Sequence, residues 1–304
     1  IAQTPVEPRD HSRLMVAYRQ NGMVEHRHFY DLPEYLHSGD LLVFNDSRVM
    51  PARIYGRRTG GVGKPIELLL LNRLGSGAWR ALVKPGRRMR EGDMFQVGDG
   101  KSTTTGTVSG VEEDGARVLQ FSHEENLYSI GEVPLPPYIH EKLGDDRRYQ
   151  TVYAKSPGSI AAPTAGLHFT KDLLERIRDV GVELAFVTLH VGWDSFRPVQ
   201  VEEFKNHKMH SEHWELGEDT ARAINRAKRE GRRIISIGTT AVRTLEHVVA
   251  LDVNKNGRIN AGSGWGDLFI YPGYHFNLID ALVTNFHLPR STLLMLTSAF
   301  AGRE

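Results

Sequence analysis

The chain has 304 residues and no cysteine, and its 38 Lys and Arg residues nearly balance its 37 Asp and Glu residues. This length predicts two domains, since domains usually hold about 100–200 residues, and the lack of cysteine excludes disulfides, a cysteine nucleophile, thiolate-bound zinc and iron–sulfur clusters. The formal net charge of +1 gives no overall attraction to nucleic acid, so a polyanion site requires local basic patches.

The sequence contains no pattern typical of a leader peptide or a membrane span. The N-terminal segment has no basic region followed by an apolar one, and no run approaches the 18–20 apolar residues of a membrane span. We therefore expect a cytoplasmic protein. Because the chain starts with Ile1 and stops directly after an apolar helical pattern, we also expect both ends to be incomplete.

The first half of the chain is rich in short strand patterns. The apolar run 40–44 predicts a buried strand that ends in the polar turn 45–48. Further short strands are predicted at 66–71, 79–83, 94–97, 103–111 and 117–121. Glycine-rich turns separate these strands, and no helical period interrupts them, which is typical of a small barrel or sandwich.

After the proline-rich segment 131–138, helical and strand patterns alternate. Helices are predicted at 171–180, 218–231, 240–250 and 291–300, and strands at 184–191, 233–237, 267–271 and 278–284. This alternation predicts a layered α/β domain. We expect a discontinuous α/β catalytic domain, residues 1–63 and 134–304, with an inserted small all-β barrel domain at residues 64–133.

Two loops resemble anion sites, because each precedes a predicted helix whose first N–H groups favour negative charge. The first contains Thr164, Gly166 and His168, and the second contains Thr239 with Arg243 one turn further on. The simpler alternatives are a tight loop capped by a threonine and an Arg243–Glu246 pair within one helix.

Histidines cluster near predicted strand ends. His190 lies at the end of the predicted strand 184–191 with Asp194 nearby, which would suit an oriented acid–base pair, although a lone histidine is more often structural. His207, His210 and Glu212 lie within six residues. If this segment is helical, His207 and His210 share a face, but a zinc site would need further ligands that the spacing does not identify.

Aromatic and basic residues suggest nucleotide contacts. Several aromatic and polar residues lie at or after the ends of predicted strands and could stack on and hydrogen-bond a purine-like ring, or belong to the core. They are Tyr271, Tyr274, Asn285, Phe286 and His287. The basic clusters could hold phosphates or simply form a solvated surface. They are Arg57 and Arg58; Lys84, Arg87, Arg88 and Arg90; and Arg147 and Arg148.

Eight sequence blocks, in order, carry a resemblance to a known family. They are GDLLVFND at 39–46, VMPAR at 49–53, PLPPYI at 134–139, RYQTVYA at 148–154, APTAGLHFT at 162–170, HKMHSE at 207–212, FIYPGY at 269–274 and TNFHLP at 284–289. Together they resemble the S-adenosylmethionine:tRNA ribosyltransferase-isomerases of queuosine biosynthesis. Relative to that family, a short N-terminal strand and a C-terminal tail are expected to be missing.

The resemblance implies a transfer reaction. The ribosyl group of S-adenosylmethionine, used as a cosubstrate, would be transferred and isomerised onto 7-aminomethyl-7-deazaguanine at the wobble position of a tRNA. The products would be epoxyqueuosine, adenine and methionine. The resemblance also suggests a monomer and no metal.

Such a reaction needs a base near neutral pH, because the sulfonium acidifies the neighbouring C5′ protons. We expect His168, His190 or His210 to be that base, with Glu212 orienting a histidine or receiving the proton of the amine. Contacts to S-adenosylmethionine are expected from Thr164, Gly166, Thr239, Arg243, Tyr271, Asn285 and His287. Contacts to tRNA are expected from Arg87, Arg88, Arg90, Arg147 and Arg148.

One block departs from the family pattern. After residues 190–192 the family commonly continues Ala-Gly-Thr-Phe, whereas this chain has Trp193, Asp194, Ser195 and Phe196. The role of Asp194 is therefore left open. Two other functions also remain open, a metal-dependent hydrolase that uses His207 and His210 and a non-catalytic RNA-binding protein that uses the barrel.

Overall fold

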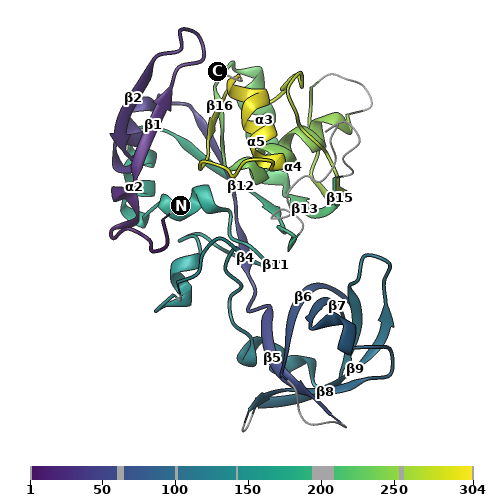
Figure 1. Cartoon of the computed structure of the whole chain (residues 1–304). Coiled ribbons are helices and arrows are strands. Elements are labelled where there is room, and N and C mark those ends of the chain that lie inside the picture. Colours follow the sequence, from purple (N-terminus) through teal and green to yellow (C-terminus); the bar gives the residue numbers. More distant parts are fainter. Residues whose placement is uncertain are drawn as a thin grey trace. The chain divides into compact units, whose positions relative to one another are not determined.

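The computed structural model describes residues 2–59, 65–99, 102–141, 143–193, 209–252 and 257–302. The chain forms two compact units, which Figure 1 shows in sequence colours. One unit comprises Ile1–Arg48, Pro137–Ser156 and Ala162–Glu304, and the other comprises Val49–Pro136 and Pro157–Ala161. These compact units are defined by contacts and are not shown to fold independently. The domain boundaries at 63/64 and 133/134 therefore stay a prediction.

The first unit is built on a six-stranded mixed sheet of order β15-β13-β12-β3-β14-β16. The strands are β3 (Leu41–Asn45), β12 (Glu183–Leu189), β13 (Glu212–Leu216), β14 (Ile234–Ile237), β15 (Gly262–Gly266) and β16 (Ala281–Val283). The four strands β12, β3, β14 and β16 are parallel, while β13 and β15 run antiparallel to their neighbours. Strand β3 is buried along its whole length because β12 and β14 flank it.

The prediction of a strand at 267–271 is wrong. The strand lies just before that segment, in β15, whose sequence Gly-Ser-Gly-Trp-Gly has low strand propensity. Its glycines fit beside the Trp214 ring, since a Cβ at Gly264 would lie 3.4 Å from that ring. Tertiary pairing with β13 therefore overrides local propensity here.

The long helices agree with the predictions to within one or two residues. They are α2 (Lys171–Asp179), α3 (Glu218–Arg229), α4 (Thr239–Ala250) and α5 (Thr292–Ala301). The side chain of Thr170 accepts a hydrogen bond from Leu173 N–H and caps α2, and Ser291 caps α5 through Leu294 N–H. Such caps satisfy N–H groups that have no partner within the helix, which fixes where each helix begins.

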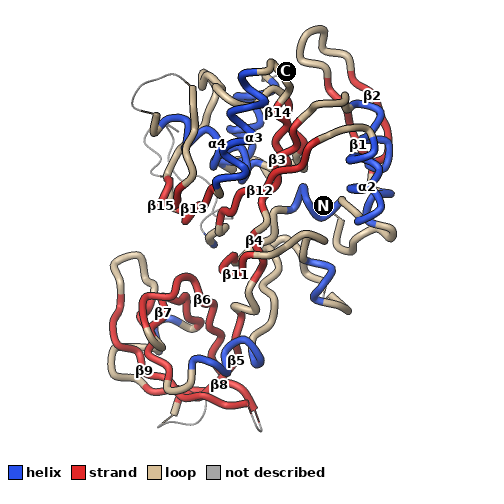
Figure 2. Tube along the Cα trace, turned by 180° about the vertical axis from the view of Figure 1, so that it is seen from behind, coloured by secondary structure: helices blue, strands red, loops and turns tan. Residues whose placement is uncertain are grey.

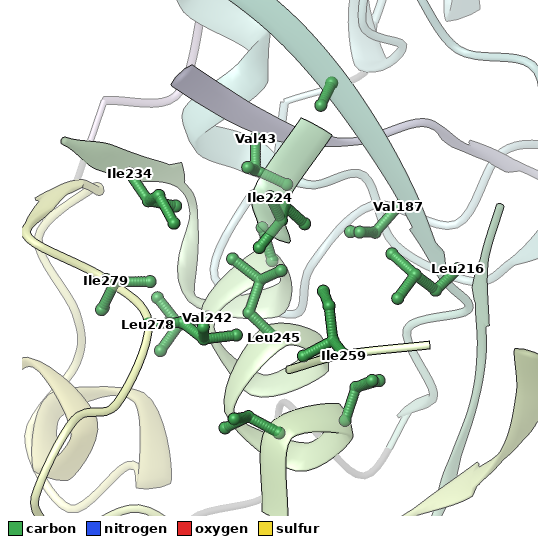
Figure 3. Packing of buried hydrophobic residues seen from close by; sticks show 14 of the residues in the cluster. Val43, Val187, Leu216, Ile224, Ile234, Val242, Leu245, Ile259, Leu278 and Ile279 are labelled. Atoms are coloured by element: carbon green, nitrogen blue, oxygen red, sulfur yellow. The ribbon is translucent and has the colours of Figure 1, made fainter. Parts of the chain in front are cut away.

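Helices cover both faces of the sheet. One face packs against α3, α4 and α5, and Figure 3 shows part of this core, including Val43, Val187 and Leu245. The other face, with Leu42 and Phe44, packs against α2 and a 3-10 helix, η2 (Phe29–Tyr35). Figures 1 and 2 show α2 on the opposite side of the sheet from α3 and α4. The predicted layered α/β architecture is confirmed.

The second unit contains a closed antiparallel barrel of order β10-β7-β6-β5-β8-β9. Its strands are β5 (Arg53–Arg58), β6 (Pro65–Gly75), β7 (Ala78–Lys84), β8 (Met94–Asp99), β9 (Ser102–Val111) and β10 (Arg117–Phe121). Fully buried side chains such as Phe95 and Leu119 fill it. The predicted inserted barrel is thus confirmed, and it also includes β5, which precedes the predicted insertion.

Smaller elements complete the chain. The strands β1 (Arg13–Ala17) and β2 (Val24–His28) form a hairpin, and β4 (Ser47–Val49) pairs with β11 (Ser156–Ser159). The short helices are η1 (Arg9–His11), η3 (Gly86–Arg88), η4 (Glu124–Asn126), α1 (Leu127–Ile130), η5 (Asp146–Tyr149) and η6 (Thr164–His168). Among the described residues, no helix has the length and apolar character of a membrane span.

Candidate active site

The candidate site lies along one edge of the six-stranded sheet. The carboxyl ends of the parallel strands β3, β12, β14 and β16 meet at this edge, and the antiparallel β13 begins there. Ligands in α/β folds bind at this kind of edge. It brings together His190 after β12, Glu212 at the start of β13, Thr239 after β14 and Asn285 after β16.

Glu212 is a buried carboxylate with three partners in the described part of the chain, His210, Gly192 and Arg243. Its Oε1 lies 3.1 Å from His210 Nε2 and accepts a hydrogen bond of 2.9 Å from Gly192 N–H. Its Oε2 accepts a hydrogen bond from Arg243 of α4, and this ion pair is almost fully buried. The carboxylate therefore ties β13, the segment after β12 and α4 together at the edge.

The charge of Glu212 is maintained inside the protein. Burial opposes ionisation, but the Arg243 guanidinium, His210 and Gly192 N–H outweigh it and hold the pKa of Glu212 at about 2. Arg243 pairs with Glu212 rather than with Glu246. Glu246 instead accepts hydrogen bonds from Tyr274 Oη and from the backbone N–H groups of Asn277 and Leu278.

His168 is held at both ring nitrogens. Its Nδ1 lies 2.7 Å from Ser12 Oγ, and its Nε2 lies 2.8 Å from Asn285 Oδ1. Asn285 Oδ1 can only accept, so Nε2 carries the proton and Nδ1 accepts from Ser12. Burial lowers the pKa of His168, while the bond to Asn285 partly offsets that effect. His168 is thus a neutral, firmly oriented imidazole.

His190 points to the other face of the sheet from Glu212. Its backbone N–H bonds to His213 O, its ring stacks on the His213 ring, and its Nδ1 is buried without a hydrogen-bond partner among the described residues. Burial and the neighbouring His213 lower the pKa of His190, although Glu215 and Asp46 act in the opposite direction. This imidazole is neutral near pH 7 and has an uncommitted nitrogen.

The loop before α2 packs tightly against the RYQTVYA block. Thr164 and Gly166 lie in η6, and a Cβ at Gly166 would be 2.0 Å from Tyr153 Oη. Only glycine fits at such a distance. The Tyr153 hydroxyl therefore faces Gly166. It is buried and has no hydrogen-bond partner in the described part of the chain.

The remaining residues expected to contact the cosubstrate lie near strand ends. Thr239 is the first residue of α4, and a Cβ at Gly238, which precedes it, would lie 3.6 Å from Ala165 of η6. His287 Nε2 lies 3.1 Å from Thr284 Oγ1, and burial lowers the pKa of His287 to about 4. Tyr271 contacts Phe269 and lies in a separate loop that follows β15.

The predicted tRNA-binding arginines fall in both units. Arg87, Arg88 and Arg90 are exposed on and beside η3 of the barrel unit, and no ion pair involves them within the described ranges. Arg147 and Arg148 lie in η5 and pair with Asp145 and Glu7. The first cluster therefore offers free cationic groups, whereas the charges of the second are partly compensated.

Two expected residues are not described by the structure, and three residues near the site were not predicted from the sequence. His207 and Asp194 lie outside the described residues, so their expected roles have no structural counterpart here. Sequence reasoning did not single out Ser12 or Tyr153, and it gave no role to Asp46, whose Oδ1 accepts a bond of 2.6 Å from Thr188. Tyr153 and Asp46 do lie in blocks of the family resemblance, which was the available indication.

A family model described as queuosine biosynthesis protein matches residues 1–304. The chain belongs to this family. The resemblance drawn from the eight sequence blocks is therefore confirmed.

Relatives in the queuosine biosynthesis family match along the whole chain. A protein of Moorella thermoacetica is 55% identical over 309 residues, and one of Symbiobacterium thermophilum is 54% identical over 310. Each match covers 100% of this chain and 88% of the relative, and both relatives are named S-adenosylmethionine:tRNA ribosyltransferase-isomerase.

A solved structure in this family supports the fold. The crystal structure of S-adenosylmethionine tRNA ribosyltransferase from Thermotoga maritima is 38% identical to this chain. The match covers 99% of this chain and 86% of that one, with a TM-score of 0.51.

Proposed function

We propose that the chain is an S-adenosylmethionine:tRNA ribosyltransferase-isomerase. It transfers and isomerises the ribosyl group of S-adenosylmethionine onto 7-aminomethyl-7-deazaguanine at the wobble position of a tRNA, and it releases adenine and methionine. The full-length match to relatives of that name supports this function over a metal-dependent hydrolase or a non-catalytic RNA-binding protein. The proposal includes a monomeric, cytoplasmic protein whose reaction needs no metal.

His190 is the group we assign as the base. The single observation behind this choice is its buried Nδ1 at the carboxyl end of β12, which has no hydrogen-bond partner among the residues that the structure describes. A base that removes a C5′ proton next to the sulfonium must be neutral and have a free lone pair. The lowered pKa of His190 meets the first condition, and the uncommitted nitrogen meets the second.

The other candidates have positioning roles in this proposal. His168 uses both ring nitrogens in hydrogen bonds and orients Asn285, while Glu212 fixes His210 and the backbone at Gly192. Thr164, Gly166 and Thr239 lie beside helix starts, where N–H groups favour the methionine carboxylate. Arg243 acts through Glu212 in this arrangement, and Asn285, His287 and Tyr271 remain proposed cosubstrate contacts.

Adenine release under single-turnover conditions tests the base assignment. His190→Ala should slow release by about 10²–10⁴-fold, the usual contribution of a general base. His168→Ala and His210→Ala should retain more activity, since they remove positioning groups. The assignment of His190 is wrong if its variant turns over like the wild type, and none of the three is the base if all do.

A further inference from the structure

A second group of side chains lies on the sheet face to which His190 points. His213 and Glu215 are two residues apart on β13, so both project from the same face. His190 directly follows β12, the strand next to β13, and its N–H donates a hydrogen bond of 2.9 Å to His213 O. Two histidines and a carboxylate are thereby gathered from β13 and from the residue that follows β12.

The three side chains approach one another closely. One potential ligand atom from each lies within 4.8 Å of the other two, and His213 Nδ1 is 3.8 Å from Glu215 Oε1. The two imidazole rings stack with their centroids 5.9 Å apart. The stack places the two imidazoles side by side on one face of the sheet.

The buried Nδ1 of His190 is an independent indication. A buried polar nitrogen without a hydrogen bond costs about 1–3 kcal/mol, and no partner for it exists among the described residues. A ligand that accepts electron pairs from imidazole would remove this cost. The half-exposed Glu215 can rotate toward such a ligand, since its side chain is 53% exposed.

We propose that His190, His213 and Glu215 form a binding site for a divalent transition-metal ion of the Zn²⁺ type. Two imidazoles and one carboxylate suit Zn²⁺, Co²⁺ or Ni²⁺ far better than Mg²⁺ or Ca²⁺, which prefer oxygen ligands. Ligands at about 2.0–2.2 Å from one ion lie about 3.3–3.6 Å apart in a tetrahedron, so small side-chain rotations complete the set. The fourth position is left for water.

This site goes beyond the proposed function, and the ion is not a cofactor of it. Coordination occupies a lone pair of His190, so a bound ion competes with the proposed base. The binding test below measures the ion alone and uses no tRNA or S-adenosylmethionine. Its failure therefore leaves the proposed reaction untouched, and failure of that reaction leaves the site untouched.

The test is a titration of the tag-free full chain, stripped with EDTA and desalted, with Zn²⁺ followed by calorimetry and elemental analysis. The wild type should bind one Zn²⁺ per chain at this site. His213→Ala should bind at least about tenfold more weakly, since loss of even an outer-shell partner costs about 10–100-fold. Glu215→Gln should weaken binding too, and its exposed position keeps the fold intact.

The matched control is His123→Ala in the barrel unit. His123 and Glu125 form the same two-residue spacing, with Nδ1 3.2 Å from Oε1, but without a second histidine. This variant should bind like the wild type. The site is ruled out if the wild type binds no stoichiometric Zn²⁺. It is also ruled out if His213→Ala and Glu215→Gln both bind Zn²⁺ as tightly as the wild type.

Discussion

At the scale of single residues, Glu212 links charge to stability. Its carboxylate is buried, yet the Arg243 charge and hydrogen bonds from His210 and Gly192 keep it ionised. Removing one partner of such a pair leaves an uncompensated buried charge, which costs more than the pair itself contributes. Glu212 therefore stabilises the site edge only while its carboxylate is ionised.

The stability of the protein should fall at low pH because Glu212 becomes protonated. The pKa of Glu212 is depressed from 4.5 to about 2 on folding, so its contribution is complete above about pH 4.5 and is lost as pH falls toward 2. The loss should be on the order of 3 kcal/mol, at 1.36 kcal/mol per pKa unit. Urea denaturation between pH 2 and pH 6 measures it.

The control for this pH dependence is Glu212→Gln. The variant is less stable at pH 7 because Arg243 loses its counter-charge, but the free energy of unfolding should fall less steeply toward low pH. Identical slopes in the two proteins would show that another group causes the acid sensitivity.

At the scale of elements, the close approach of η6 to Tyr153 fixes a loop at the site. Gly166→Ala should destabilise the protein by about 1–3 kcal/mol, because the new methyl group would lie 2.0 Å from Tyr153 Oη. Thermal unfolding measures the effect. Gly144→Ala is the control, since a Cβ there meets nothing within 4 Å, and equal melting temperatures of the two variants would contradict the packing argument.

Helices and barrel strands could be predicted from sequence, because their information is local. The apolar period and the capping residues Thr170 and Ser291 define α2 and α5 within one or two residues. Strand β15 could not be predicted, because its glycines pair only in the presence of β13 and the Trp214 ring. Such long-range pairing cannot be recognised from the few residues around the strand.

The part of the candidate site that depends on local sequence could also be predicted. Residues that follow strands, such as His190 and Asn285, could be proposed from strand ends alone. The bond between Ser12 and His168 joins residues 156 positions apart, so no spacing rule reveals it. The pairing of Arg243 with Glu212 rather than Glu246 likewise depends on how β13 and α4 pack.

At the scale of the whole molecule, net charge hides local basic groups. The proposed tRNA contact at Arg87 and Arg88 predicts that Arg87→Glu combined with Arg88→Glu weakens tRNA binding. The slope of log affinity against log salt should also become shallower by about 1.4, at about 0.7 per lost contact with a single-stranded loop. Binding measured at several salt concentrations provides both quantities.

The matched control changes the same number of charges on α3. Arg222→Glu combined with Arg226→Glu replaces two exposed arginines that pair with acidic neighbours. This variant should retain the wild-type slope. If both double variants flatten the slope equally, the effect reflects total charge, and the contact at η3 is ruled out.

The reversed direction of β13 brings the chain back to the site edge that it has just left. The chain reaches the site edge twice in succession, once on leaving β12 and once on entering β13. The connection between them is therefore anchored at both ends beside the candidate catalytic groups. The backbone bond from His190 N–H to His213 O closes the two ends of this connection against each other, so the positions of His190 and Glu212 are set by the β12–β13 register.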